Sequence, residues 1–189
     1  NPKSNEVRLE YAKALTNLKK YDEAKKQFLK LVNSSLASSE ISLTVALLAI
    51  ELDDNILAEK YFLQSLKRGH PQPAQIYIYL AGIYDDRGDF DETLTWLNKI
   101  TSINNEYYID SKILMAEYIS KYDSVDSALE MLRQLKKKQL SYNEKLIILR
   151  NKASLLLNDN RSQDAYDLMK LEEEEFKDSP EFKFDYAML

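Results

Sequence analysis

Small residues recur along this chain with a period of about 35 residues. Six alanines mark the period, and the gaps between them are 34, 35, 35, 37 and 34 residues. They are Ala12, Ala46, Ala81, Ala116, Ala153 and Ala187. Another small residue follows each of the first five, twelve positions later; these are Ala24, Ala58, Thr93, Ala128 and Ala165. Two small residues at fixed places in every period let two neighbouring segments cross closely, so the pattern predicts a repeated pair of packed helices.

The apolar residues within each period have helical spacing. In the third period, Tyr77, Leu80 and Tyr84 lie at i, i+3 and i+7, which is one face of a helix. No window alternates apolar and polar residues over a useful length, so we expect no strands. The sequence predicts an all-α chain of five helix–turn–helix repeats and the first helix of a sixth. The repeats cover about residues 5–37, 39–73, 74–107, 108–140, 143–178 and, in part, 180–189.

A period near 34 residues with two helices per unit is typical of tetratricopeptide repeats. The segment from Ala74 to Ser102 resembles one closely. It contains Tyr77-x-x-Leu80-Ala81-x-x-Tyr84, then Gly88-Asp89-Phe90-Asp91-Glu92, then Leu97 and Ile100. The resemblance implies a right-handed α-solenoid, in which each repeat contacts only its neighbours. We expect residues 1–189 to form a single solenoid domain and, because the chain stops within a helical pattern, to be a piece of a longer protein.

Composition and charge narrow the function classes. The net charge is −5 and there is no basic stripe, whereas nucleic-acid binding requires clustered Lys and Arg, so we expect no nucleic-acid partner. The run Lys136-Lys137-Lys138 is interpreted as a solvated helix end. The lack of cysteine excludes disulfides and thiolate zinc sites. No stretch has the roughly 18 apolar residues needed to span a membrane.

Residues for catalysis or metal binding are scarce. The one histidine, His70, stands in a predicted loop between repeats, where we expect an exposed polar side chain without further metal ligands nearby. The acidic string at 85–92 lacks the alternating ligands of a calcium loop, because Arg87 and Phe90 interrupt it. We expect no catalytic residue, no metal and no cofactor, and therefore not an enzyme. The acidic run 172–175 is either a solvated helix face or a contact for a basic partner.

The first helix of each repeat lines the concave face in this fold, which is the usual binding groove. Taking equivalent positions around each alanine gives the candidate partner-binding residues. They are Leu9, Lys13, Leu43, Leu47, Ile50, Ile78, Asp85, Ile113, Glu117 and Arg150. An aliphatic row flanked by carboxylates suits an amphipathic helix or an apolar peptide with some basic character. The alternative is that the aliphatic residues pack against the neighbouring repeat.

These observations predict a protein-binding scaffold or adaptor. The stretch from Val45 to Ile100, with Ala58-Glu59-Lys60-Tyr61-Phe62 and Trp96, is similar to multi-repeat envelope lipoproteins of Gram-negative bacteria. That resemblance implies a bacterial lipoprotein on the periplasmic side of the outer membrane. It also implies an adaptor for a periplasmic protease, since some of these lipoproteins have that role.

Two alternatives stay open. One is a scaffold for a cytoplasmic assembly. The other is an oligomerisation module that forms a homodimer through the open surface of the sixth repeat. The residues of that surface are Phe182, Phe184, Tyr186 and Met188.

The alanine register can be tested by overpacking. We expect Ala116→Leu to lower the free energy of unfolding by about 1–3 kcal/mol, because the larger side chain pushes apart two helices that must touch. Thermal unfolding followed by circular dichroism measures the change. An unaltered thermal stability would show that the register is wrong.

Overall fold

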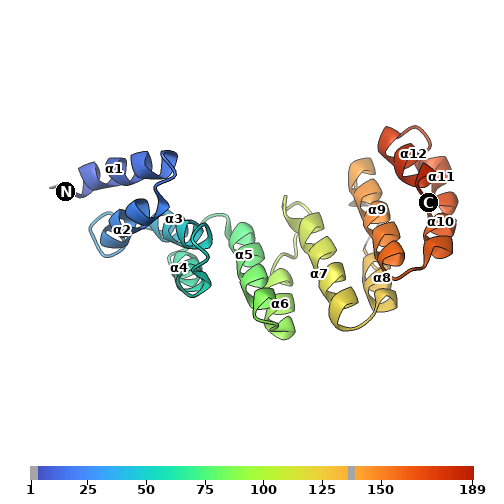
Figure 1. The fold of residues 1–189 in the computed structure, drawn as a ribbon, viewed down its shortest axis with the longest axis horizontal. Coiled ribbons are helices and arrows are strands. Elements are labelled where there is room, and N and C mark those ends of the chain that lie inside the picture. The colour runs from blue at the N-terminus through green and yellow to red at the C-terminus, as the bar shows by residue number, and fades with distance from the viewer. Residues whose placement is uncertain (1–3, 136–138) are drawn as a thin grey trace. The chain divides into compact units, whose positions relative to one another are not determined.

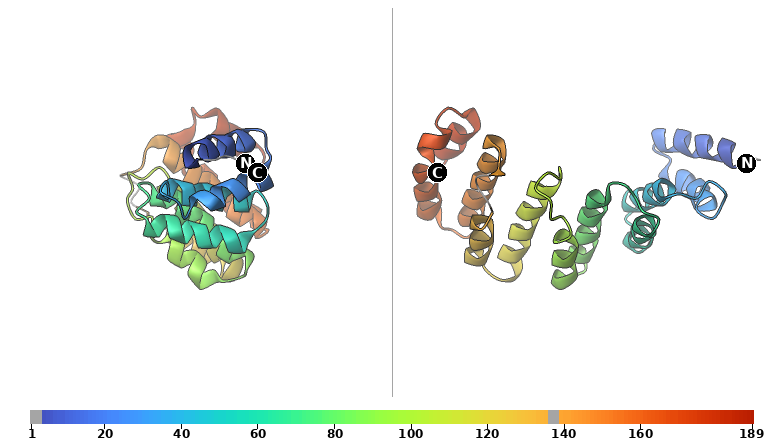
Figure 2. Two further views of the ribbon diagram at one scale, coloured as in Figure 1. Left: turned by 90° about the vertical axis from the view of Figure 1, so that its left-hand side faces the viewer. Right: turned by 180° about the vertical axis from the view of Figure 1, so that it is seen from behind.

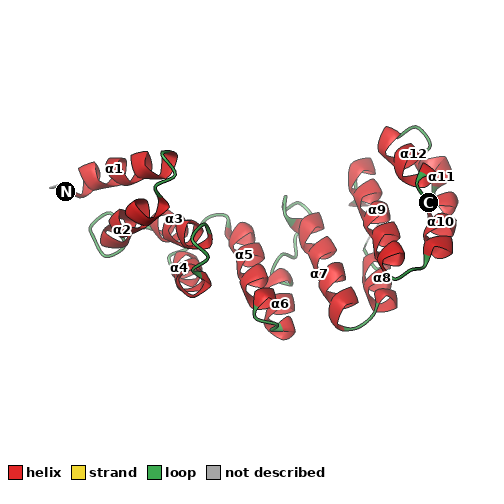
Figure 3. Ribbon diagram, in the orientation of Figure 1, coloured by secondary structure: helices red, strands yellow, loops and turns green. Residues whose placement is uncertain are grey.

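The computed structural model describes residues 4–135 and 139–189, so the basic run 136–138 lies outside the described residues. Within these ranges the regular structure is helical and no strand occurs (Figure 3). The helices are α1 (Asn5–Asn17), α2 (Tyr21–Leu31), α3 (Ser39–Ile50), α4 (Asn55–Lys67), α5 (Pro73–Asp86), α6 (Phe90–Leu97), α7 (Tyr108–Tyr122), α8 (Val125–Arg133), α9 (Tyr142–Asn158), α10 (Ser162–Leu171), α11 (Glu173–Phe176) and α12 (Pro180–Ala187).

The chain divides into two compact units, Asn1–Asp89 with α1 to α5 and Phe90–Leu189 with α6 to α12 (Figure 1). In the first unit α1 packs on α2, and α3 packs on both α2 and α4. In the second, α7 packs on α8 and α9 on α10, and α12 contacts both α9 and α10 (Figure 2). The second unit also holds the only tryptophan of the sequence, Trp96, which is half-buried in α6 with the Lys99 amine 5.0 Å from its ring centre. The single domain expected from the sequence stays a prediction.

The small residues that set the period are buried. Ala12 in α1 and Ala24 in α2 are both 0% exposed, and so are Ala116 in α7 and Ala128 in α8. The remaining register residues are also buried; they are Ala46, Ala58, Ala81, Thr93, Ala153 and Ala165. Ala187, near the end of α12, is exposed because no described residue covers it. The alanine pattern therefore identified the helix-packing positions in the first five repeats.

The turn inside a repeat uses a left-handed residue seven positions after the register alanine. Lys19, Asp53 and Asn160 have φ values of 58°, 54° and 59°, and Gly88 has 75°. In each case the next amide donates a 2.9 Å hydrogen bond to the carbonyl five residues before it, as the Lys20 amide does to Leu15. This closure is a Schellman motif, which satisfies a carbonyl at the end of the first helix.

The fourth repeat closes its turn differently. Asp123 stands at the equivalent position with φ −126°, and its amide donates to the Ile119 carbonyl at 2.8 Å. It therefore offers a natural comparison with the left-handed turns.

One arginine joins the first helix pair to the second. The Arg68 guanidinium, just after α4, donates to the Val32 carbonyl at 3.0 Å and to the Ser38 carbonyl at 3.2 Å. It also donates to the Ser42 hydroxyl at 2.8 Å. The planar fork of arginine can serve three acceptors in fixed directions. The C-terminal end of α2 is thereby held to the N-terminal end of α3.

His70 differs from its sequence-based prediction. The residue is 9% exposed rather than exposed, with its Nε2 3.1 Å from the Glu40 carboxylate and its Nδ1 accepting a bond from the Gln72 amide at 3.2 Å. The prediction of an exposed side chain was wrong because the chain reverses at Gly69, where φ is 73°. The reversal places the imidazole beside the beginning of α3.

A chain of aromatic contacts holds the end of the second unit together. Phe176 lies 5.1 Å from Tyr142 and 6.0 Å from Phe182 between ring centres. Tyr186 lies 5.6 Å from Phe182 and 5.3 Å from Tyr166. Aromatic rings at these separations attract one another beyond the burial of their area. The contacts fix α12 against α9, α10 and α11.

A half-buried carboxylate links α4 to α5 in the first unit. Glu59 accepts a 2.7 Å hydrogen bond from the Tyr84 hydroxyl and a 2.6 Å contact from the Arg87 guanidinium. Burial acts to raise the pKa of the Glu59 carboxyl, but the two bonds outweigh it and lower that pKa below its usual value of 4.5. The link therefore depends on the ionised carboxylate.

We expect Lys19→Gly to raise the free energy of unfolding by about 0.5–1 kcal/mol, because glycine adopts a left-handed φ without a Cβ clash. Asp123→Gly is the matched control. It should give no gain, because φ is negative at Asp123. Urea unfolding of both variants measures the difference, and equal effects would contradict the strain argument.

We expect Glu59→Gln to lower the free energy of unfolding by about 1 kcal/mol at pH 7. The pKa is lower in the folded chain than in the unfolded one, so the stabilisation is present above the unfolded pKa. It is lost as the pH falls through the folded pKa, and the two proteins should converge below about pH 4.5. Urea midpoints between pH 7 and 3 measure this, with Glu51→Gln on exposed Glu51 as control. A gap that is constant with pH would show that the charge is unimportant.

Candidate functional site

An open groove of about 570 Å³ lies in the second unit beside the first helices of its repeats. We call it the C-terminal groove. Its lining includes Ile113 from α7, six residues of α9 and the end of α12. Those of α9 include Ile147, Arg150, Ser154 and Leu157; Phe184 and Asp185 lie in α12, and Met188 directly follows it.

Helix periodicity brings these side chains together. Ile147, Arg150, Ser154 and Leu157 are spaced three, four and three apart, so they lie on one face of α9. Phe184 and Met188, the residue that caps α12, are four apart and lie on one side as well. The side chains at the two ends of the α9 face, Ile147 and Leu157, are apolar and are 44% and 40% exposed. Phe184 and Met188 are 68% and 73% exposed. An exposed apolar groove of this kind commonly marks an interaction site.

Two polar bridges cross the C-terminal groove. The Arg150 guanidinium donates to the Asp185 carboxylate, which ties α9 to α12. The Asn151 amide donates to the Glu117 carboxylate at 3.4 Å, which ties α9 to α7. Exposed pairs of this type add little stability, so their main effect is to fix the position of the helices that line the groove.

The position of α12 is set at its beginning and near its end. The Ser179 hydroxyl accepts a 3.1 Å hydrogen bond from the Phe182 amide, and Pro180 opens the helix with a backbone that suits it. Tyr186 makes a hydrogen bond with Tyr166 that raises the pKa of Tyr186 to about 12. These contacts hold the rest of α12 so that Phe184 stays beside α9.

A second groove, the N-terminal groove, lies in the first unit between α1, α2 and α3 and measures about 440 Å³. Leu9, Phe28 and Ile41 give it apolar surface, and Lys13 and Asn17 add polar groups. Lys13 forms an exposed ion pair with Glu10 at 2.9 Å, an (i, i+3) contact within α1. This groove therefore combines an apolar surface with a polar edge.

The structure distributes the predicted site residues over several environments. Leu9 and Lys13 line the N-terminal groove, Ile113 and Arg150 line the C-terminal groove, and exposed Glu117 lies beside the latter through its contact with Asn151. The other half-buried candidates lie on α3 and α5; they are Leu47, Ile50, Ile78 and Asp85.

Leu43 differs from the other candidates because it is only 8% exposed. The helix that carries it, α3, contacts both α2 and α4 and buries seven of its twelve residues. Little of the Leu43 side chain is available to a partner. At this position the residue packs against neighbouring helices, as the alternative interpretation expects.

Several residues of the C-terminal groove are not among the candidates that the sequence predicts, Ile147 and Asn151 among them. The sequence places Phe184 and Met188 only on a possible oligomer surface. A signal for the last two was present. They stand three before and one after Ala187, the same offsets that lead from Ala12 to Leu9 and Lys13.

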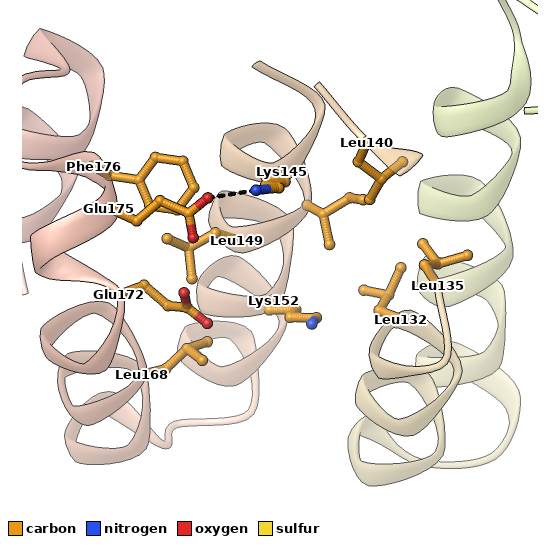
Figure 4. Close-up of a pocket in the computed structure, with 11 residues that line it drawn as sticks. Leu132, Leu135, Leu140, Lys145, Leu149, Lys152, Leu168, Glu172, Glu175 and Phe176 are labelled. Carbon is orange, nitrogen blue, oxygen red and sulfur yellow. Dashed lines mark hydrogen bonds and ion pairs between the residues drawn. The ribbon is translucent and has the colours of Figure 1, made fainter. Parts of the chain in front are cut away.

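A third cavity, between α8, α9, α10 and α11, measures only about 30 Å³ (Figure 4). Leucine side chains such as Leu132 and Leu149 line it, and Lys145 contacts Glu175 at 2.7 Å (Figure 4). A space of this size holds about one water molecule, so we regard it as a packing gap.

Residues 4–135 and 139–189 contain no group of three or more histidine, cysteine or acidic side chains that could hold a metal ion. In the same part of the chain, every helix is too short or too polar to cross a membrane.

Comparisons with known proteins agree with this architecture. The tetratricopeptide repeat family model matches residues 6–37. No curated protein sequence matches the chain significantly. Solved structures do match it. YrrB, a tetratricopeptide repeat protein with an unusual peptide-binding site, is 12% identical and aligns over 96% of this chain and 91% of its own, with a TM-score of 0.61.

Two other solved structures are similar over nearly the whole chain. The structure of Naa15/Naa10 bound to HypK-THB is 19% identical over 98% of this chain, with a TM-score of 0.66, and this chain spans 29% of the matched one. PilW, a widely conserved type IV pilus biogenesis factor, is 17% identical over 97% of this chain and 83% of its own, with a TM-score of 0.61. The predicted all-α solenoid class is therefore confirmed: this chain is a protein of the tetratricopeptide repeat fold, and its residues 6–37 match the family itself.

Proposed function

We propose that this chain is a non-enzymatic scaffold that holds a protein or peptide partner against the first helices of its repeats. The observation that carries the proposal is the C-terminal groove, where exposed Phe184 and Met188 stand beside Ile113 and Leu157. Binding sites are mostly apolar clefts of about 300–1,000 Å³ with a few placed polar groups. The groove, at about 570 Å³, has that size and that composition.

The fold and the side chains support binding rather than chemistry. The tetratricopeptide fold is one of protein–protein interaction scaffolds. Two of the charged groups that line the C-terminal groove, Arg150 and Asp185, form an ion pair with each other. Buried aromatic and arginine anchors dominate the affinity of protein interfaces, which makes Phe184 the principal expected contact.

The proposed partner-binding residues are those that line the two grooves or lie directly beside them. They are Leu9 and Lys13 in the first unit and Ile113, Glu117 and Arg150 in the second, joined by Phe184 and Met188. A role as an envelope lipoprotein that serves a periplasmic protease stays a prediction from resemblance. So does a homodimer through α12, which would use the same Phe184 and Met188.

A selection from random peptides tests the proposal. Phage-displayed 16-residue peptides are selected on the immobilised chain, and their affinities are then measured on variants. We expect each selected peptide to lose at least tenfold in affinity, about 1.4 kcal/mol, with one of two groove variants. Phe184→Asp/Leu157→Asp disrupts the C-terminal groove, and Leu9→Asp/Lys13→Glu disrupts the N-terminal groove.

The control is Ile56→Asp/Leu63→Asp, which adds the same charge as the C-terminal groove variant at two exposed apolar positions of α4 that line neither groove. It should leave the affinities unchanged. If every selected peptide binds both groove variants as tightly as the parent chain, the first-helix grooves are not the binding sites and the proposal fails.

A further inference from the structure

Another open groove, of about 450 Å³, lies between α8 and α10, the second helices of their repeats. We call it the α8–α10 groove. Leu129 from α8 and Leu156 from α9 are each 4% exposed and form its floor. Leu168 is half-buried, and Leu171, at the end of α10, is 79% exposed. Apolar surface therefore runs from the floor of the groove to an exposed leucine.

Acidic side chains share the α10 face with these leucines. Asp164, Asp167, Leu168 and Leu171 are spaced at i, i+3, i+4 and i+7, so they lie on one side of the helix. This stretch is about 10 Å long, which equals two turns of a helix. Asp167 is exposed and accepts a 3.1 Å hydrogen bond from the neutral Gln163 amide.

Carboxylates outnumber cations at the end of the groove where α10 begins. The Arg161 guanidinium contacts Asp126 at 2.8 Å, Asp164 at 2.7 Å and Asp159 at 3.9 Å. One positive charge therefore faces three negative ones, and the cluster keeps a net negative charge. Arg161 is fully engaged by these partners and is not free to attract an acidic ligand.

The run of four glutamates at 172–175 begins directly after Leu171, beyond the lining of the groove. Glu174 is paired with Lys177 at 2.9 Å and Glu175 with Lys145 at 2.7 Å, so the run adds little unbalanced charge.

The groove lining also contains cations. On the α8 wall the guanidinium of Arg133 is engaged by Glu130 at 3.6 Å, and Lys152 from α9 is only 7% exposed. The groove thus has a leucine floor, and its excess of carboxylates lies along the exposed α10 side.

We propose that the α8–α10 groove binds a basic amphipathic helix. Leucine-type side chains of the partner would lie on Leu129, Leu156 and Leu168, and its lysines or arginines would lie beside Asp164 and Asp167. Helix-in-groove recognition uses apolar anchors at i, i+3, i+4 and i+7, and two turns match the length of the α10 stretch. The groove shares no lining residue with the N-terminal or C-terminal groove, so it is separate from the sites of the proposed function.

A designed peptide tests this inference. The probe is a fluorescein-labelled 14-residue peptide of leucine and lysine, with leucines at i, i+3, i+4 and i+7. Its affinity for the chain is measured by fluorescence anisotropy. We expect Asp167→Lys/Leu171→Lys to weaken binding at least tenfold, because it reverses the charge and removes the apolar end of the groove. Both positions are exposed, and circular dichroism verifies that the variant is folded.

The control is Glu51→Lys/Ile56→Lys, which makes the same change in charge and apolar surface at two exposed positions that line none of the grooves. It should leave the affinity within about twofold, whereas a loss equal to or greater than that of the first variant would overturn the proposal. A leucine–glutamate peptide with the same apolar pattern should bind at least tenfold more weakly than the probe. Equal binding of the two peptides would also overturn the proposal, because charge would then have no role.

Discussion

Close contact between paired helices is the constraint on which the rest of this structure depends. Ala12 and Ala24 in the first unit, like Ala116 and Ala128 in the second, have no exposed surface. Because the side chains at these positions are methyl groups, the paired helices can approach almost backbone to backbone, and larger residues would separate them. That approach fixes the rotation of each helix about its own axis. It therefore decides which face of every first helix is left for grooves.

The fold was predictable because its main determinants are local and repeated. The alanine period and the i, i+3, i+7 spacing identified the helix pairs without any knowledge of distant contacts. The turns were less visible. The glycine at position 88 indicates a left-handed backbone, but Lys19 and Asn160 adopt the same conformation although neither is a glycine. The burial of His70 was missed because it depends on a chain reversal at Gly69 and on Glu40, thirty residues away.

The grooves could be predicted only where the repeat register determines them. Ile113 and Arg150 hold equivalent positions in adjacent repeats, and the C-terminal groove gathers both. Leu43 holds the same position in its repeat, but the helices on both sides of α3 bury it. A periodic pattern does not show how many helices will pack around a given residue. In the α8–α10 groove, Arg161 contacts Asp126, a residue 35 positions away on another repeat, and a local pattern does not predict such a contact.

The position of Trp96 gives the two units different fluorescence properties. The chain's only indole lies in α6, within Phe90–Leu189, while the first unit carries tyrosines but no tryptophan. Tryptophan emission during unfolding therefore reports on one half of the molecule, whereas far-ultraviolet circular dichroism averages over both. In a protein whose repeats contact mainly their neighbours, the two signals need not coincide. A single emission curve would give the free energy of the second unit, not that of the whole chain.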